Sequence, residues 1–156
     1  MVTPAVHARP ARVQLCSARQ LAVRLGRSEG AAGTTYVAIV FTNHGTAACS
    51  LRGYPGVSSV GGADGHQIGA SARRTPAATP EVVLRVGGVA SAVYGQAEAL
   101  NYPKARCHPA SARGLRVYPP GSTRAWYLPL KHLACSSASV GDSSVRPVRP
   151  GATGGV

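Results

Sequence analysis

Cys49-Ser50-Leu51-Arg52-Gly53-Tyr54-Pro55-Gly56-Val57 is the stretch that decides the fold, and the apolar run of residues 36–43 leads into it. Pro55 presets the φ angle at the first central position of a β-turn, and Gly56 supplies a positive φ at the second. Tyr54 precedes a proline, so its backbone is extended. The stretch therefore predicts a strand that begins at Cys49, a structural turn made of Gly53, Tyr54, Pro55 and Gly56, and a further strand.

Short apolar runs recur outward from this turn, and Gly, Pro, Asn and Asp separate them. Residues 34–43 are apolar on both faces of a strand, which places them at the centre of a sheet. Helical periodicity is missing apart from a possible turn at residues 111–113. Further strands are expected at residues 20–27, 57–60, 66–72, 81–86, 89–97, 114–118, 124–130 and 144–148. Seven to nine short strands at this spacing predict an all-β fold, an antiparallel, immunoglobulin-like β-sandwich.

The chain has 156 residues, the length of one domain. Residues 1–14 read as a disordered leader, residues 15–150 as the single sandwich domain, and residues 151–156 as a flexible tail. Val6 and Ala8 match the small-residue pattern of a signal-peptide cleavage site, so the leader is interpreted as the remnant of a signal peptide or as a plain disordered segment. No apolar run is long enough to span a bilayer.

The four cysteines, Cys16, Cys49, Cys107 and Cys135, are widely spaced, and none forms a C-x-x-C pair. In an oxidising compartment this pattern predicts two disulfide bonds. Four cysteines allow three pairings. We favour Cys16 with Cys49 and Cys107 with Cys135, because disulfides between sequence neighbours most often join adjacent strands. The chain-entropy model gives each such crosslink at most about 3.5–4 kcal/mol.

The chain is strongly basic, with 17 Lys and Arg against 5 Asp and Glu. Lys104 and Lys131 are the only lysines, so arginine carries nearly all of the positive charge. This excess is typical of a genome-wide preference for Arg, and it also raises encounter rates with polyanions, whatever the fold. Charge by itself does not choose among acidic polymers, membranes and nucleic acid.

No catalytic constellation emerges from the motifs. Gly26-Arg27-Ser28-Glu29-Gly30 matches G-x-S-x-G, but a strand rather than a helix follows it, so we interpret it as a polar turn and not as a hydrolase nucleophile. Cys107, His108, His132 and Cys135 could hold zinc, although adjacent Cys107 and His108 are awkward as joint ligands and a disulfide is favoured. The sequence thus predicts no catalytic, cofactor-binding or metal-binding residue.

Aromatic residues are the best candidates for a binding patch, because aromatic side chains dominate interface hot spots. We expect Tyr36 and Trp126 in the core and Tyr102 on a surface loop, and Tyr54 fits either place. The five acids lie outside aromatic-rich segments, which disfavours a glycosidase. The arginines are dispersed and lack the pattern of a nucleic-acid reader, so specific nucleic-acid binding is not expected.

The residues also resemble a known family, the secreted actinobacterial domains of unknown function numbered 4232, over about residues 16–150. The resemblance covers Cys16, Gly30-Ala31-Ala32-Gly33, Phe41-Thr42-Asn43, the Cys49-x-Leu51-x-Gly53-Tyr54-Pro55-Gly56-Val57 signature, Gly88-x-Ala90-x-Ala92, Cys107, Leu115-x-Val117-x-Pro119-Pro120 and Cys135. It implies a secreted or lipid-anchored cell-envelope domain, a β-sandwich with two disulfides, and it brings no catalytic residues. Tyr94 departs from the pattern, which has a bulkier, tryptophan-like residue nearby.

These features together predict a monomeric, non-enzymatic binding or structural module that acts outside the cytoplasm. Its expected partner is an envelope polymer or a protein, and the basic surface favours an anionic one. Two alternatives remain at this stage. One is a small hydrolase or zinc-dependent enzyme on the same sandwich, and the other is a polyanion-binding protein with free thiols.

Overall fold

Strand β2 (Thr34–Asn43) is the first long strand without exposed positions along its middle, and it lies inside the larger sheet of the protein. The computed structural model describes residue 3 and residues 12–154. Within them the elements are η1 (Ala18–Gln20), β1 (Leu21–Ala31), β2, β3 (Cys49–Leu51), β4 (Gly56–Gly61), β5 (His66–Ile68), β6 (Arg73–Arg74), β7 (Val82–Leu84), β8 (Val89–Ala97), η2 (Ala99–Asn101), α1 (Lys104–Cys107), β9 (Pro109–Tyr118), β10 (Trp126–Cys135), β11 (Ser143–Val145) and β12 (Arg149–Pro150).

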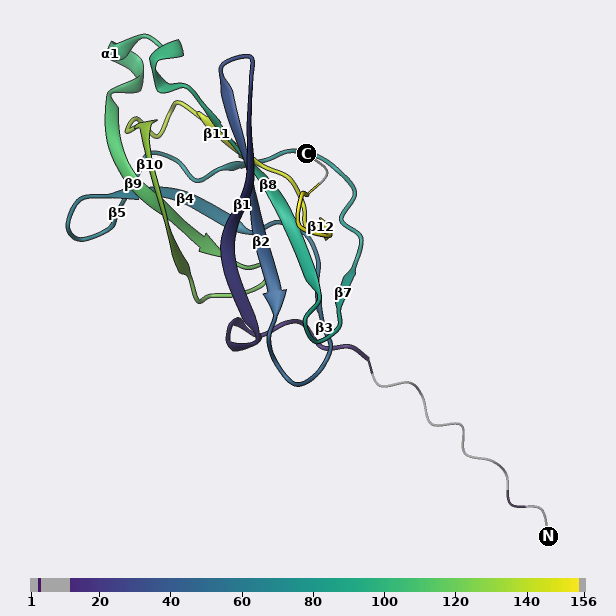
Figure 1. Ribbon diagram of the computed structural model, residues 1–156. Coiled ribbons are helices and arrows are strands. Elements are labelled where there is room, and N and C mark those ends of the chain that lie inside the picture. Colours follow the sequence, from purple (N-terminus) through teal and green to yellow (C-terminus); the bar gives the residue numbers. More distant parts are fainter. Residues whose placement is uncertain (1–2, 4–11, 155–156) are drawn as a thin grey trace.

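Two sheets pack face to face (Figure 1). The first has the strand order β1-β2-β8-β11-β6, with β12 also paired to β8, and the second has the order β10-β9-β4-β5. Strands β3 and β7 form a separate pair. All pairings between named strands are antiparallel except that of β11 with β6. The prediction of an antiparallel all-β fold is confirmed, while the immunoglobulin-like connectivity stays a prediction.

The main core lies between the two sheets. Ile39 and Phe41 of β2 meet Leu115 and Val117 of β9 there, and all four side chains are fully buried. Alternate residues of a strand point to opposite faces, so Ala38 and Val40 lie on the other face of β2. These two are nevertheless buried, because residues 151–154 pack over that face of the sheet.

Residues 151–154, expected in a flexible tail, instead pack along β8. The amide of Gly151 donates to the carbonyl of Val89 at 3.0 Å, and Ser91 Oγ donates to the carbonyl of Gly151 at 2.7 Å. Residues 155 and 156, and nearly all of the expected leader, lie outside the described residues. At the other end, the carbonyl of Gln14 accepts a hydrogen bond from the amide of Ser50 at 2.9 Å, so a residue of the expected leader pairs with β3.

Several local expectations need correction. The described residues form twelve strands rather than seven to nine, because two-residue strands such as β6 and β12 are too short to show a pattern in the sequence. Strand β1 continues to Ala31, and the hairpin turns at Ala32 and Gly33, which have φ of 49° and 80°. Residues 111–113 lie in β9 and not in a helical turn. The described helices are all short, and none is long and apolar enough to cross a membrane.

Candidate functional site

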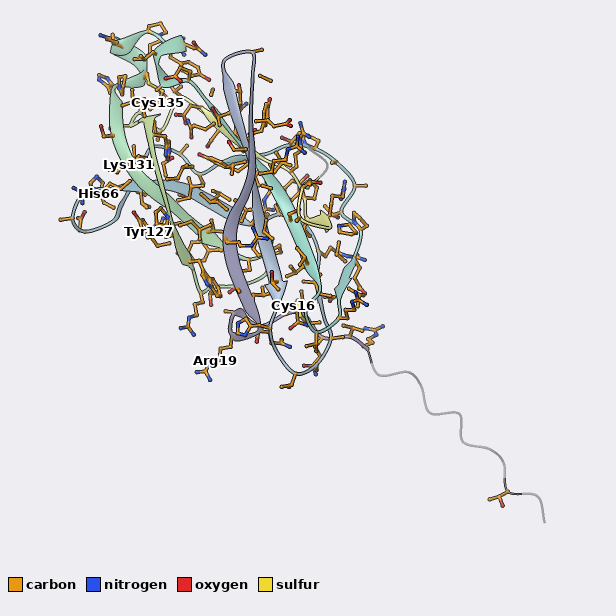
Figure 2. All side chains as sticks on the ribbon, in the orientation of Figure 1. Cys16, Arg19, His66, Tyr127, Lys131 and Cys135 are labelled. Atoms are coloured by element: carbon orange, nitrogen blue, oxygen red, sulfur yellow. A yellow bond between two sulfur atoms is a disulfide. The ribbon has the colours of Figure 1, made fainter. Side chains whose placement is uncertain are left out.

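The four cysteines form the two predicted disulfides, Cys16 to Cys49 and Cys107 to Cys135. All four side chains are buried, and the bonds lie at opposite ends of the sandwich (Figure 2). The pairing is confirmed, but the crosslinks do not join neighbouring strands. Cys16 precedes η1 and bonds to β3, and Cys107 ends α1 and bonds to the end of β10. Since Cys107 and Cys135 hold each other, the zinc set proposed from them is not assembled.

The predicted structural turn exists, but its left-handed residue is Gly53 rather than Gly56. Gly53 has a φ of 90°, whereas Gly56 is the first residue of β4 and its φ is not positive. The carbonyl of Gly53 accepts a hydrogen bond from the amide of Val148 at 2.8 Å. This contact, with a residue 95 positions away in the printed sequence, holds the peptide in the orientation that only glycine adopts readily.

Tyr54 fixes the loop that follows β6. Its hydroxyl donates to the carbonyl of Thr75 at 2.6 Å, and the guanidinium of Arg74 lies 5.3 Å from its ring centre. The ring itself packs against the main core. The turn therefore holds together three parts of the sequence, namely its own residues, the loop after β6 and the segment at Val148. We interpret its role as structural.

A cavity of about 280 Å³ opens between the two sheets at their neighbouring edge strands, β1 and β10. Both strands shift register there, β1 between Leu25 and Ser28 and β10 between Pro129 and His132. Such bulges bend a strand and redirect its side chains. Ser28, Lys131 and His132 line the cavity together with Tyr94, Gln96 and Glu98 of β8 and the segment after it.

Hydrogen bonds connect His132 of β10 with β4 of the same sheet. His132 Nδ1 lies 2.8 Å from the carbonyl of Leu130, which can only accept, so Nδ1 carries the proton. His132 Nε2 then accepts from Ser59 Oγ at 2.8 Å. In the other sheet, Tyr94 donates to Gln96 Oε1, and Gln96 Nε2 donates to Asp142 Oδ2 at 2.9 Å.

Tyr94 is the most deeply buried ionisable group of this chain of hydrogen bonds. Burial raises the pKa of the Tyr94 phenol to about 12, and the nearby Asp142 carboxylate acts in the same direction. The nearby hydroxyls of Ser59 and Ser143 oppose this rise in the pKa. Asp142 also accepts the amide proton of Cys135 at 2.8 Å, so the carboxylate is satisfied although it is buried.

The Ser59–His132 pair has the spacing of a nucleophile and its base. Ser59 is only 6% exposed, however, and it does not line the cavity, so a substrate cannot reach its hydroxyl. Ser28, the serine of the G-x-S-x-G motif, does line the cavity, but it lies within β1 and not at a turn. The two sheets are joined instead through Tyr94, Gln96 and Asp142, whose carboxylate binds the Cys135 amide at the end of β10, and this role is structural.

Positive charge on the surface is almost uncompensated. All described Arg and Lys side chains are exposed except those of Arg116 and Arg149, which are half-buried. Among the described residues only Arg27 forms an ion pair with a carboxylate, that of Glu29 at 2.7 Å. Of the other acids, Asp64 pairs with His66 and Asp142 is buried.

Three arginines lie where β6 meets β11, and we call Arg73, Arg74 and Arg146 the arginine edge. Arg73 pairs with Ser144 and Arg74 with Val145, the residue before Arg146. The Arg146 guanidinium lies 5.8 Å from the ring centre of Tyr36, and the Arg74 guanidinium covers Tyr54. Cation–π contacts hold such side chains in place while leaving their donors accessible to an anion.

Comparison with known proteins identifies the family. The sequence model described as Domain of unknown function (DUF4232) matches residues 16–149. The chain belongs to this family. No curated protein matches the chain, and no solved structure does.

The DUF4232 match begins at Cys16 and ends at Arg149, close to the 16–150 span of the predicted resemblance. It includes both disulfides, the turn at Gly53, the cavity and the arginine edge. The family brings no assigned catalytic residue to this chain, so the site of the DUF4232 domain has to be argued from its own surface.

The aromatic predictions held only in part for this DUF4232 domain. Trp126 packs against the main core, as expected, but Tyr36 is half-buried and carries Arg146 on its ring. The fully buried tyrosine is Tyr94. Tyr102 is half-buried against the Cys107–Cys135 cluster. In the sequence, only the Arg73-Arg74 doublet indicates the arginine edge. Arg146 joins it through the register of β6 with β11, which the sequence does not show.

Proposed function

We propose that this chain is a non-enzymatic binding domain that acts outside the cytoplasm and recognises an anionic partner, either an envelope polymer or a protein. The observation that carries the proposal is the uncompensated positive surface, on which only Arg27 among the described cations has a carboxylate partner. Such a surface attracts polyanions and raises their association rates.

The disulfides support the location. Two fully formed disulfides are typical of proteins in oxidising compartments, and they are rare in the cytosol. The arginine edge supports the anionic partner, because guanidinium groups bind carboxylates and phosphates in a bidentate geometry. Cation–π support of Arg74 and Arg146 reduces the side-chain freedom that binding removes.

The test is titration calorimetry with two probes, inorganic polyphosphate and poly-L-glutamate, at NaCl concentrations between ~50 and ~500 mM. We expect both probes to bind and the affinity to fall steeply as salt rises. The double variant Arg73→Ala/Arg146→Ala should bind at least about tenfold more weakly at low salt, since each lost contact with a charged group costs on the order of 1 kcal/mol.

The matched control is Arg19→Ala/Arg124→Ala, which removes the same charge at the opposite end of the molecule. Both arginines are exposed and border one surface hollow near η1. This control should lose no more than about threefold in affinity, because it changes only the long-range field. Absence of binding at ~50 mM salt, or binding that salt leaves unchanged, would contradict the proposal.

A further inference from the structure

Tyr127 of β10 presents one face of its ring to solvent. Its neighbours Trp126 and Leu128 pack against the core, so alternation along the strand directs Tyr127 outward, and the side chain is 54% exposed. The other ring face lies on Gly114 of β9. A Cβ atom at Gly114 would lie 2.6 Å from Cε2 and 2.8 Å from Cζ of Tyr127, so only glycine permits this position.

A hydrogen bond also fixes the orientation of the Tyr127 ring. The Tyr127 hydroxyl donates to the carbonyl of Arg113 at 3.2 Å. A flat aromatic surface that is fixed before a ligand arrives loses little side-chain entropy on binding. Exposed tyrosines that are immobilised in this way are suited to recognition, because they offer large apolar area and have few rotatable bonds.

Two cations flank the ring. Arg113 and Lys131 line the same open depression as Tyr127, together with Pro129 and Leu130. A second depression adjoins it, and Arg113 and Lys131 line that one also. Both side chains are exposed, and neither has a carboxylate partner among the described residues. Lys131 lies in the β10 bulge, and Figure 2 shows Tyr127 and Lys131 beside β9 and β10 on one side of the molecule.

We propose that this surface, defined by Tyr127, Arg113 and Lys131, binds an anionic glycan. The inference rests on the proposed function and names the chemical class of the ligand. The apolar face of a pyranose ring stacks on Tyr127, and the carboxylates of the glycan pair with Arg113 and Lys131. Tyr127 and Lys131 are four residues apart on β10, and a regular strand separates such Cα atoms by about 13 Å, the bulge shortening this span. We therefore take an oligosaccharide, rather than one sugar, as the ligand that contacts both.

A glycan fits this surface better than a nucleic acid does. Single-stranded nucleic acids are bound on rows of aromatic rings along a continuous basic groove. Here one ring is offered, and the aliphatic side chains of Pro129 and Leu130 extend the depression beside it. The two disulfides point to the same conclusion, because proteins with such bonds act where envelope glycans occur.

The experiment compares four probes by calorimetry with the full chain at ~100 mM NaCl. They are an oligosaccharide of galacturonic acid, its methyl ester, in which the carboxylates are uncharged, a polyphosphate of equal charge, and a single-stranded DNA oligonucleotide. We expect the galacturonate oligomer to bind about tenfold more tightly than both the ester and the polyphosphate, and more tightly than the oligonucleotide.

Tyr127→Ala should lower the affinity for the galacturonate oligomer about tenfold and leave that for polyphosphate unchanged, because only the stacking contribution is removed. Tyr127→Phe keeps the ring and should bind within about twofold of the unchanged protein. Lys131→Ala should weaken binding of the galacturonate oligomer, whereas Lys104→Ala, at the only other lysine and also exposed, should not.

The possible failures are distinguishable. If no polyanion binds, polyphosphate included, the proposed function itself is wrong. If polyphosphate binds but the galacturonate oligomer binds no better, or if Tyr127→Ala keeps its glycan affinity, only the glycan assignment is overturned. If the protein prefers the oligonucleotide and Tyr127→Ala abolishes this preference, the surface binds nucleic acid and the glycan assignment is also overturned. Binding retained by Tyr127→Phe shows that the ring and not the hydroxyl makes the contact, and unchanged polyphosphate binding by Tyr127→Ala argues against unfolding as the cause of its loss.

Discussion

Asn43, the last residue of β2, shows how a single buried amide organises the chain around it. Its side chain is fully buried, and its Nδ2 donates to the carbonyls of Ala47 at 2.9 Å and Leu84 at 3.0 Å. Its Oδ1 accepts from the amide of Gly45 at 2.9 Å. The side chain thereby fixes the loop before β3 and ties it to β7. Buried backbone groups need such partners, because each one left unpaired costs free energy.

Asn43→Ala should therefore destabilise the protein by about 2–4 kcal/mol, since it leaves one amide and two carbonyls without their partner. Urea unfolding followed by the fluorescence of Trp126, the only tryptophan, measures the loss. Asn101→Ala is the control, because Asn101 is exposed and donates only to Gly33 at 3.2 Å. It should cost less than about 1 kcal/mol. Equal costs for the two variants would show that burial of Asn43 is not the reason.

At the scale of elements, β8 holds the sandwich together from the middle. It pairs with β2 along its whole length and also with β11 and β12, and its Tyr94 reaches the polar chain that leads to the second sheet. A neutral phenol suits this place, because a phenolate there would lose its hydration and face Asp142. The protonation state of the Tyr94 phenol therefore makes the contact between the two sheets depend on pH.

The raised pKa of Tyr94 has a definite sign for stability. The unfolded chain ionises near the ordinary value of 10 and the folded chain only near 12, so the unfolded state holds fewer protons between these values. The free energy of unfolding should be independent of this group below pH 10 and should fall by about 2–3 kcal/mol as pH rises to 12.

Unfolding measured between pH 9 and 11.5 should reveal this slope, and Tyr94→Phe should remove most of it. Tyr127→Phe is the matched control, because Tyr127 is exposed and its removal should leave the slope unchanged. If Tyr94→Phe retained the full alkaline loss, the slope would have to come from other groups.

The elements with strong local patterns were predictable from the sequence. Residues 34–43 and 89–97 became β2 and β8 with the expected bounds, because two apolar faces or a regular alternation leave no other way to bury them. Gly53 was predicted as a turn residue, but its left-handed conformation was not, because that conformation depends on the amide of Val148, which no local pattern indicates. The same holds for the site, since Tyr127 and Gly114 meet only through the register of β9 with β10.

At the scale of the whole molecule, the formal net charge of +12 opposes folding. Exposed charges of one sign repel each other more strongly in the compact state than in the extended chain. Salt screens this repulsion, and the Debye length falls from about 30 Å at 0.01 M to about 10 Å at 0.1 M. The protein is therefore stabilised by salt over the range in which its proposed ligands are released.

The melting temperature should rise by about 3 °C between ~10 and ~300 mM NaCl, which corresponds to about 1 kcal/mol for a domain of this size. Scanning calorimetry without ligand measures the shift. The variant Arg19→Ala/Arg73→Ala/Arg124→Ala/Arg146→Ala carries four fewer charges and should show a smaller rise. A melting temperature that falls with salt would mean that attractive ion pairs outweigh the repulsion.

Both disulfides join cysteines that are consecutive in the chain, Cys16 with Cys49 and Cys107 with Cys135. A polypeptide that is threaded through a translocation channel from its N-terminus delivers the first pair before Cys107 has emerged. The first bond then forms without a competing thiol, and the second forms when no other free cysteine is left. In that order of emergence the two wrong pairings do not arise, so a domain exported as proposed would need a thiol oxidase but no reshuffling enzyme.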